Sequence, residues 1–264
     1  MTATAALVAV LLALFRVAAH GIDPLVAALG AAGVVVAGLF VVVERRSPAP
    51  LVPMRIFRSR TLVGGNLVIL LAGIAVDGLL ILVTLYAQHV LGLSALQFGL
   101  TMGTMTVTSV VAVLAGQQLV TRFGFRAVAG AGLTLMAVAG LLLSRLRPGG
   151  TMAEDLLAGL IVFGVGMGAA FVAGQIPALA DVPEHDAGLA AGVEETPFAV
   201  GTTMGAALVS AVAIGHATRG GTDVPSAAAL TDGFAVAFLV LAALAILGAA
   251  VSAVLLRRPR TVAA

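Results

Sequence analysis

The run LVGGNLVILLAGIAVDGLLILVTLYAQ, residues 62–88, decides the fold of this 264-residue chain. Asp77 is its only charged residue, and the run is longer than the roughly 20 mostly apolar residues that a helix needs to cross a membrane. Over the whole chain 61% of the residues are hydrophobic and only 10% are charged, against about 25% charged residues in an ordinary soluble domain. We therefore expect this chain to lie in a lipid bilayer.

Seven further apolar runs of similar size accompany this one. We expect about eight membrane spans, at residues 3–19, 25–43, 62–88, 94–120, 127–146, 156–180, 187–214 and 233–256. The first run is short and contains Arg16, but no basic residues precede it and a second apolar run follows, so it is not typical of a signal peptide. The predicted fold class is an all-α, polytopic transmembrane helix bundle.

The arginines predict the orientation of the bundle. Short cytoplasmic loops of membrane proteins collect Lys and Arg, and all fourteen basic residues here are arginine. Placing residues 44–60 inside puts ten of them in the cytoplasm: Arg45, Arg46, Arg55, Arg58, Arg60, Arg122, Arg126, Arg257, Arg258 and Arg260. We expect a multi-pass protein of the cell (inner) membrane with both termini cytoplasmic.

A proline- and arginine-rich segment divides the chain. Pro48, Pro50 and Pro53 prevent a continuous helix, and the arginines beside them hold the segment at the lipid headgroups. We expect two leading helices in residues 1–46, a cytoplasmic linker in 47–61, a six-helix domain in 62–258 and a cytoplasmic tail in 259–264.

The composition argues against several function classes. The chain has no cysteine, and its four histidines lack the spacing of metal ligands, so we expect no metal site. No His with carboxylates, and no Ser with His, can be assembled on facing spans, which argues against an intramembrane enzyme. Arginines beside a membrane do not form a nucleic-acid-binding stripe, so we expect no nucleic-acid partner.

Glycine is abundant, with 32 residues in the chain. Each glycine destabilises a soluble helix by about 1 kcal/mol relative to alanine, but in lipid small residues let helix backbones approach closely. Gly164, Gly166 and Gly168, and the pair Gly201 and Gly205, are spaced for such contacts.

Four stretches carry a family resemblance: RRSPAPLVPMRIFRSRTLVGGNLVILLAG (45–73), LYAQHVLGLSALQFGL (85–100), LVTRFGFR (119–126) and DAGLAAG (186–192). Together they resemble the fourteen-span drug:proton antiporters of the major facilitator superfamily. The resemblance runs from about residue 7 to 258 and covers that family's last eight spans, which are two extra central helices and the C-terminal six-helix half. The N-terminal six-helix domain has no counterpart in this sequence.

The family's cytoplasmic loop motif reads roughly G-x-x-x-D-R-x-G-x-R, and QQLVTRFGFR supplies its Arg122, Gly124 and Arg126. Thr121 stands at the acid position and Gln117 at the leading glycine, so the match is degenerate. From the residues alone, Gly124 permits a tight turn between two spans, and the arginines suit lipid phosphates or helix carbonyls. Both anchoring and gating stay open, with anchoring favoured.

Asp77 is the first candidate for proton coupling. It lies 15 residues into its run, or about 22 Å along a helix and close to mid-membrane. An ionisable group there costs several kcal/mol and is a functional candidate for that reason. Burial favours its neutral form, which a proton-carrying carboxylate needs. The resemblance implies that Asp77 faces the transport path.

Glu194 and Glu195 are the other candidates, and the sequence permits two structures around them. In an unbroken helix from residue 187 they lie about 10 Å inside the membrane, beside a kink at Pro197. In the other, Thr196 is an N-cap and Pro197 the first helical residue, so the acids stay in the wet interface. We favour the unbroken helix because residues 187–193 are too apolar for a loop.

Gln88 and Gln175 are lesser candidates for lining a substrate cavity. Gln88 lies near an outer helix end, and Gln175 lies near the inner end of the sixth span, which in the superfamily lines the cavity. An amide offers neutral donors and acceptors to an uncharged part of a substrate, although helix-to-helix hydrogen bonding is the commoner use.

The resemblance implies a transporter component that exports small amphipathic compounds or drugs and is driven by the proton gradient, with no cofactor. Alternating access needs two halves. Such a chain would pair with a separately encoded N-terminal half or with a second copy of itself. The alternative is a non-transporting membrane protein, either the remnant of a truncated transporter or a structural or regulatory partner.

Overall fold

A computed structural model describes residues 60–147, 149–179, 187–218 and 226–256, with a few positions between 31 and 42. Apart from those few positions, the predicted leading helices (residues 1–46) lie outside the described residues, as do most of the predicted linker (47–61) and the tail (259–264).

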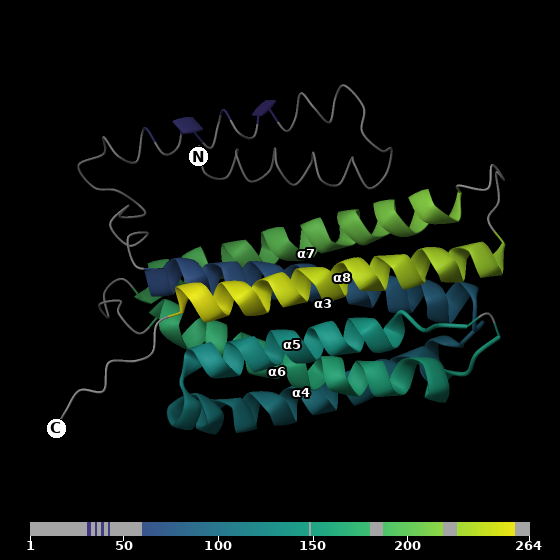
Figure 1. Cartoon of the computed structure of the whole chain (residues 1–264), viewed down its shortest axis with the longest axis horizontal. Helices are drawn as coiled ribbons and strands as arrows, with labels where there is room; N and C mark the ends of the chain where they lie inside the picture. The colour runs from purple at the N-terminus through teal and green to yellow at the C-terminus, as the bar shows by residue number, and fades with distance from the viewer. Residues whose placement is uncertain are drawn as a thin grey trace.

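All regular structure in the described residues is helical (Figure 1). The elements are α3 (Arg60–His89), α4 (Ala95–Phe123), α5 (Phe125–Leu143), η2 (Met152–Leu157), α6 (Ala158–Leu179), α7 (Ala187–Ala217) and α8 (Ala227–Leu255). Within this part of the chain six helices are long and apolar enough to cross a membrane, with η2 and α6 forming one of them. The all-α prediction is confirmed for this part, while the total of eight spans stays a prediction.

Helix capping explains where the observed ends differ from the predicted ones. α8 begins six residues before the predicted start at 233, because the Ser226 side chain accepts a hydrogen bond from the Ala229 N–H at 3.2 Å and caps the helix. The sixth predicted span begins at Met152 rather than 156, where Thr151 accepts from the Glu154 N–H and a single π-helical turn leads into α6. Polar residues next to an apolar run therefore extend the helices.

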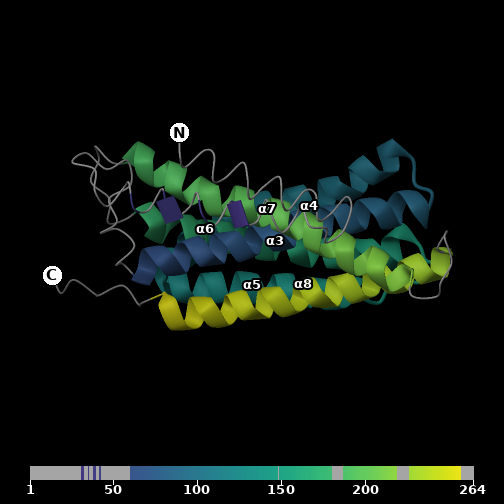
Figure 2. The same ribbon diagram turned by 90° about the horizontal axis from the view of Figure 1, so that it is seen from above.

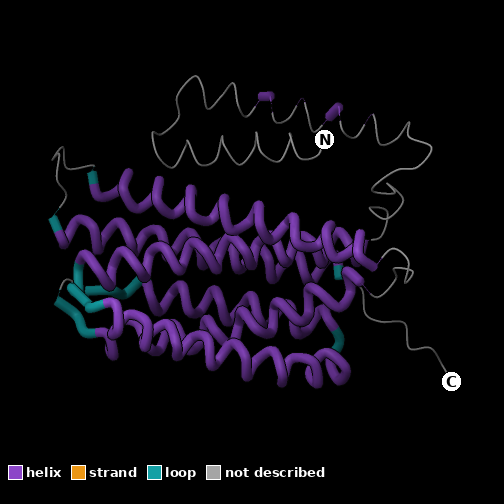
Figure 3. The backbone as a smooth tube through the Cα atoms, turned by 180° about the vertical axis from the view of Figure 1, so that it is seen from behind, coloured by secondary structure: helices purple, strands orange, loops and turns teal. Residues whose placement is uncertain are grey.

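The six helices form a bundle with α3 at its centre. Figure 2 shows α5 and α8 on one side, α4, α6 and α7 on the other, and α3 between them. The close contacts add that α5 packs directly against α6 as well as α8, that α3 packs against α6, α7 and α8, and that α4 packs mainly against α6. In the most apolar stretch of α3, 67% of the residues are buried, but in that of α4 only 22% are. The tube view in Figure 3 shows the hairpin connections gathered at the two ends of the bundle.

The two ends are named here by residues they contain. The His89 end holds the connections after α3, α5 and α7, and the Arg60 end holds the start of α3 and the connection at Gly124.

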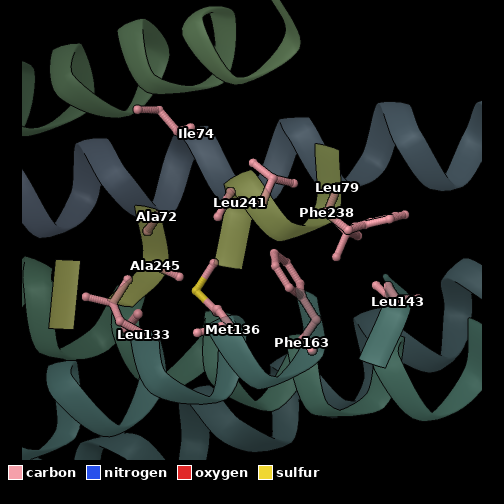
Figure 4. Packing of buried hydrophobic residues seen from close by; sticks show 14 of the residues in the cluster. Ala72, Ile74, Leu79, Leu133, Met136, Leu143, Phe163, Phe238, Leu241 and Ala245 are labelled. Atoms are coloured by element: carbon pink, nitrogen blue, oxygen red, sulfur yellow. The ribbon is translucent and has the colours of Figure 1, made fainter. Parts of the chain in front are cut away.

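The core lies where α3, α5, α6 and α8 meet. Figure 4 shows Leu133 and Met136 of α5, Phe163 of α6, and Phe238 and Leu241 of α8 packed together. Because lipid tails are as apolar as leucine, such contacts stabilise the bundle through close packing rather than through the hydrophobic effect. The precise fit of helix surfaces therefore decides stability.

Glycines provide that fit at the predicted positions. Gly164 and Gly168 lie against backbone oxygens of Met105 and Ser109 on α4. Gly166 faces α5, where a Cβ atom in its place would come within 2.6 Å of the Gly132 oxygen. Since a contact under 3.0 Å forces a shift, each position needs a residue without a side chain. The predicted role of this glycine run in close helix packing is confirmed.

Candidate functional site

Asp77 lies near the middle of α3, as predicted, in the span Leu62–His89. Its side chain is half-buried, and it makes no hydrogen bond or ion pair with another described residue. Leu70 and Gly73, on the same face of α3, both lie against α7. The carboxylate therefore lies along the seam between α3 and α7 rather than in the apolar core.

Close backbone contact forms this seam. Gly201 and Gly205 of α7 lie directly against the carbonyl oxygens of Leu70 and Ile74. On α3, Gly73 faces α7 in the same way: a Cβ atom at Gly73 would lie 2.8 Å from the Phe198 carbonyl oxygen. The predicted small-residue step in α7 is thus confirmed, and it fixes the register of the two helices around Asp77.

An aromatic pair between α6 and α7 lies beside the seam, close to Asp77. Phe171 of α6 and Phe198 of α7 meet edge to face with ring centroids 5.0 Å apart, and both side chains are half-buried. Phe198 lies against Gly73, one helical turn from Asp77 toward the Arg60 end. The half-buried acid and this pair together form the candidate site. Its chemistry suits a compound that has both an apolar ring and a positive charge.

The unbroken-helix interpretation of the Glu194 and Glu195 region is confirmed. α7 runs from Ala187 to Ala217 with Pro197 inside it. The Thr196 hydroxyl donates to the Gly192 carbonyl oxygen at 2.9 Å, within the same helix. The alternative in which Thr196 caps a helix beginning at Pro197 is wrong, because this hydroxyl satisfies a carbonyl and not an N–H group. Glu195 is exposed, and the Glu194 side chain lies outside the described residues.

The structure does not bring Asp77 and Glu195 together. Gly201 and Gly205 lie against the carbonyl oxygens of Leu70 and Ile74, and Gly73 lies against Phe198 and Thr202. Asp77, one turn beyond Gly73, therefore lies about 10–16 Å beyond Glu195 along α7. A proton therefore cannot pass directly from one of these carboxylates to the other, and a path that uses both needs other groups between them.

The two glutamines also lie away from Asp77. Gln88 is exposed in the last turn of α3, about 16 Å along the helix from Asp77. Gln175 is exposed on α6, one turn beyond Phe171 toward the Arg60 end. Phe171 and Phe198 therefore separate Gln175 from Asp77. Neither amide hydrogen-bonds to another described side chain.

The loop motif forms a one-residue connection between α4 and α5. Gly124 has φ +80°, which residues with a side chain rarely adopt, and its N–H donates to the Val120 oxygen at 2.8 Å. The prediction of a tight turn there is confirmed. Arg122 and Arg126 are exposed, and Arg126 lines an open pocket of about 450 Å³ with Phe123 and Ser252.

Large apolar side chains are exposed along α4 and α7. On α4 they are Leu96, Leu100, Val107, Val110, Val111, Leu114, Leu119 and Phe123, and on α7 they are Met204, Leu208 and Ile214. They lie on the two helices that flank α3 and α6 (Figure 2). Such faces suit either lipid or a further helical domain.

Two pairs of side chains were missed by reasoning from sequence: Phe171 with Phe198, and Tyr86 with Asp155. Tyr86 is buried and its hydroxyl lies 2.7 Å from an Asp155 oxygen. Its status as the only tyrosine of an apolar chain was a usable signal, because a buried phenol needs a hydrogen-bond partner. In the described ranges no three His, Cys, Asp or Glu side chains lie close enough to hold a metal ion.

Comparison with known proteins gives consistent matches. Residues 65–264 match the family model described as Major Facilitator Superfamily. The chain is 30% identical over 212 residues to the multidrug efflux pump LfrA of Mycolicibacterium smegmatis, covering 80% of this chain and 42% of that protein. It is 34% identical over 201 residues to the puromycin resistance protein pur8 of Streptomyces alboniger, covering 73% and 39%. It is 30% identical over 176 residues to the quinolone resistance protein NorB of Staphylococcus aureus, covering 66% and 38%. The chain spans less than half the length of these relatives.

Proposed function

The chain belongs to the major facilitator superfamily, and from this premise we propose that it forms the C-terminal part of a secondary transporter that exports small amphipathic compounds in exchange for protons. Its relatives include a multidrug efflux pump and resistance proteins for puromycin and quinolones, and its described helices suit a multi-pass membrane protein. The proton gradient supplies the energy, and no cofactor is needed.

The observation that carries this proposal is the position of Asp77. A half-buried carboxylate in the middle of a span is costly, and it has no partner among the described residues to offset that cost. A proton would neutralise it, and a cationic substrate would replace that proton. Phe171 and Phe198, one turn away, offer ring surface to the apolar part of the same substrate.

Alternating access requires a second six-helix half, on the same polypeptide or on another. The apolar faces of α4 and α7 suit such a half, since their most apolar stretches are only 22% and 28% buried. Glu195 is then expected to lie at this contact, because an exposed carboxylate facing hydrocarbon would cost several kcal/mol. A second copy of this chain is the alternative occupant.

Export is tested by the accumulation of ethidium, a lipophilic cation, in bacteria that lack their own efflux pumps. Cells that produce this chain with the N-terminal six-helix half of a full-length drug:proton antiporter are expected to hold less ethidium than cells producing either part alone. A protonophore should remove the difference, and Asp232→Asn, which changes an exposed acid on α8, should preserve it. Equal accumulation with and without the N-terminal half, at matched protein levels, would favour the non-transporting alternative.

For the orientation, we propose that the Arg60 end faces the cytoplasm, which follows from the arginine distribution. The connection between α7 and α8 then lies outside the cell. An alkaline phosphatase domain fused into this connection is expected to be active, and one fused at residue 124, between α4 and α5, inactive. The reverse pattern would contradict the proposed orientation.

A further inference from the structure

An open pocket lies between α5 and α8 at the Arg60 end of the bundle, where the two helices pack against each other (Figure 1). Its volume is about 450 Å³. Arg126, in the first turn of α5, is the only charged residue in its lining, and small residues of both helices form its walls: Ala127, Gly130, Ala131, Ala249 and Ala253. The pocket is separate from Asp77, which lies along the seam between α3 and α7.

The walls of this pocket suit hydrocarbon. Ala131 and Ala253 are exposed, so the pocket opens at the side of the bundle, where a membrane protein meets lipid. Ser252 is fully buried, and its hydroxyl donates to the Ala249 carbonyl oxygen at 2.8 Å, so its proton is already used. A buried water needs two to four polar partners, which these walls do not offer. An acyl chain fills such a space through close van der Waals contact.

The mouth of the pocket suits an anion. Arg126 is exposed and makes no hydrogen bond or ion pair with another described residue, so its guanidinium donors are available to a ligand. Gly124 gives the first turn of α5 no side-chain cap, and the positive end of the helix dipole adds to the charge of Arg126. The same charge repels the lipophilic cations that the Asp77 site suits.

One molecule that combines an anionic group with an acyl chain is a phospholipid. A guanidinium binds a phosphate through two parallel hydrogen bonds. From Arg126 the pocket extends about 7 Å along α5 to Ala131, which is the direction from the headgroups toward the hydrocarbon. The lining has no carboxylate to pair with the ammonium of a zwitterionic headgroup. Charge complementarity therefore favours a lipid with a net negative charge.

We propose that this pocket binds one anionic phospholipid, with the phosphate on Arg126 and one acyl chain between α5 and α8. Phe123 of α4 also lines the pocket, so the bound lipid contacts three helices. It holds the one-residue connection at Gly124 against the end of α8. The proposal does not depend on transport, and it holds for either orientation of the bundle.

Native mass spectrometry of the full chain in a neutral detergent counts the phospholipids bound to each molecule. Phosphatidylglycerol, which is anionic, is compared with phosphatidylcholine carrying the same acyl chains. The wild type is expected to bind one phosphatidylglycerol about fivefold more tightly than phosphatidylcholine. Arg126→Gln should lose this preference, whereas Arg145→Gln, which changes an exposed arginine at the His89 end, should keep it.

A second pair of variants tests the pocket without changing its charge. Ala253→Leu adds bulk to the pocket from an exposed position, so it should weaken the binding of phosphatidylglycerol although Arg126 is intact. Ala243→Leu is the control, because Ala243 is an exposed residue about 15 Å away along α8 and does not line the pocket. Size-exclusion chromatography should give a wild-type-like peak for both variants.

Three results would overturn the lipid site. The first is equal binding of the two lipids by the wild type, or equal binding of phosphatidylglycerol by Arg126→Gln and Arg145→Gln. The second is equal binding of phosphatidylglycerol by Ala253→Leu and Ala243→Leu, which would place the lipid outside the pocket. The third is complete displacement of the lipid by inorganic phosphate, which has no acyl chain and would identify the occupant as a free anion.

Discussion

Asp77→Asn is expected to abolish proton-driven export while leaving the bundle inserted and folded. Asparagine keeps the volume of the side chain and its place on the seam between α3 and α7, but it cannot take up and release a proton. Because the Asp77 carboxylate has no partner among the described residues, no hydrogen bond or ion pair is lost. Export driven by a pH gradient should fall to the level of vesicles without the protein.

The control for this variant is Asp232→Asn. Asp232 is an exposed acid on α8, so its replacement makes the same change in charge away from the seam. It should retain wild-type export. If Asp77→Asn exports as well as Asp232→Asn at equal protein levels, Asp77 has no part in coupling.

Gly205→Leu is expected to prevent assembly of the bundle. Gly205 lies directly against the Ile74 carbonyl oxygen, and a Cβ atom there would overlap the backbone of α3. Overpacking a core with flexible neighbours costs typically 1–3 kcal/mol, and a rigid helix backbone gives way less easily than a side chain. We therefore expect α3 and α7 to separate and most of the protein to aggregate or be degraded.

Gly215→Leu is the matched control, because it is on the same helix and nothing lies within 4 Å of its Cβ position. Size-exclusion chromatography of detergent-solubilised protein measures both variants. Gly215→Leu should elute as a single wild-type-like peak, and Gly205→Leu should lose that peak. A monodisperse Gly205→Leu protein would show that the close contact between α3 and α7 does not hold the bundle together.

Much of the fold could be predicted because membrane helices follow from local sequence. The apolar runs gave six helices in the described residues, and small-residue spacing identified Gly201 and Gly205 as contact positions. The continuous α7 followed from the apolar residues before Glu194. Helix ends were less accurate, since capping by Ser226 and Thr151 depends on single polar side chains.

The candidate site could be predicted only in part. Asp77 was found because one charge in a span is visible in the sequence alone. Contacts such as Phe171 with Phe198, and Tyr86 with Asp155, join different helices, and no local pattern pairs them. The separation of Asp77 from Glu195 likewise depends on the register of α3 on α7, which close backbone contacts set.

Proton exchange tests the central claim most directly. The chain is reconstituted with the N-terminal six-helix half of a full-length drug:proton antiporter in liposomes that contain a pH-sensitive dye, and ethidium is added under an imposed pH gradient. Substrate movement is expected to be accompanied by proton movement in the opposite direction, and both should vanish in Asp77→Asn but not in Asp232→Asn. Ethidium movement without proton movement, or neither in a correctly folded assembly, would contradict proton-coupled export by this protein.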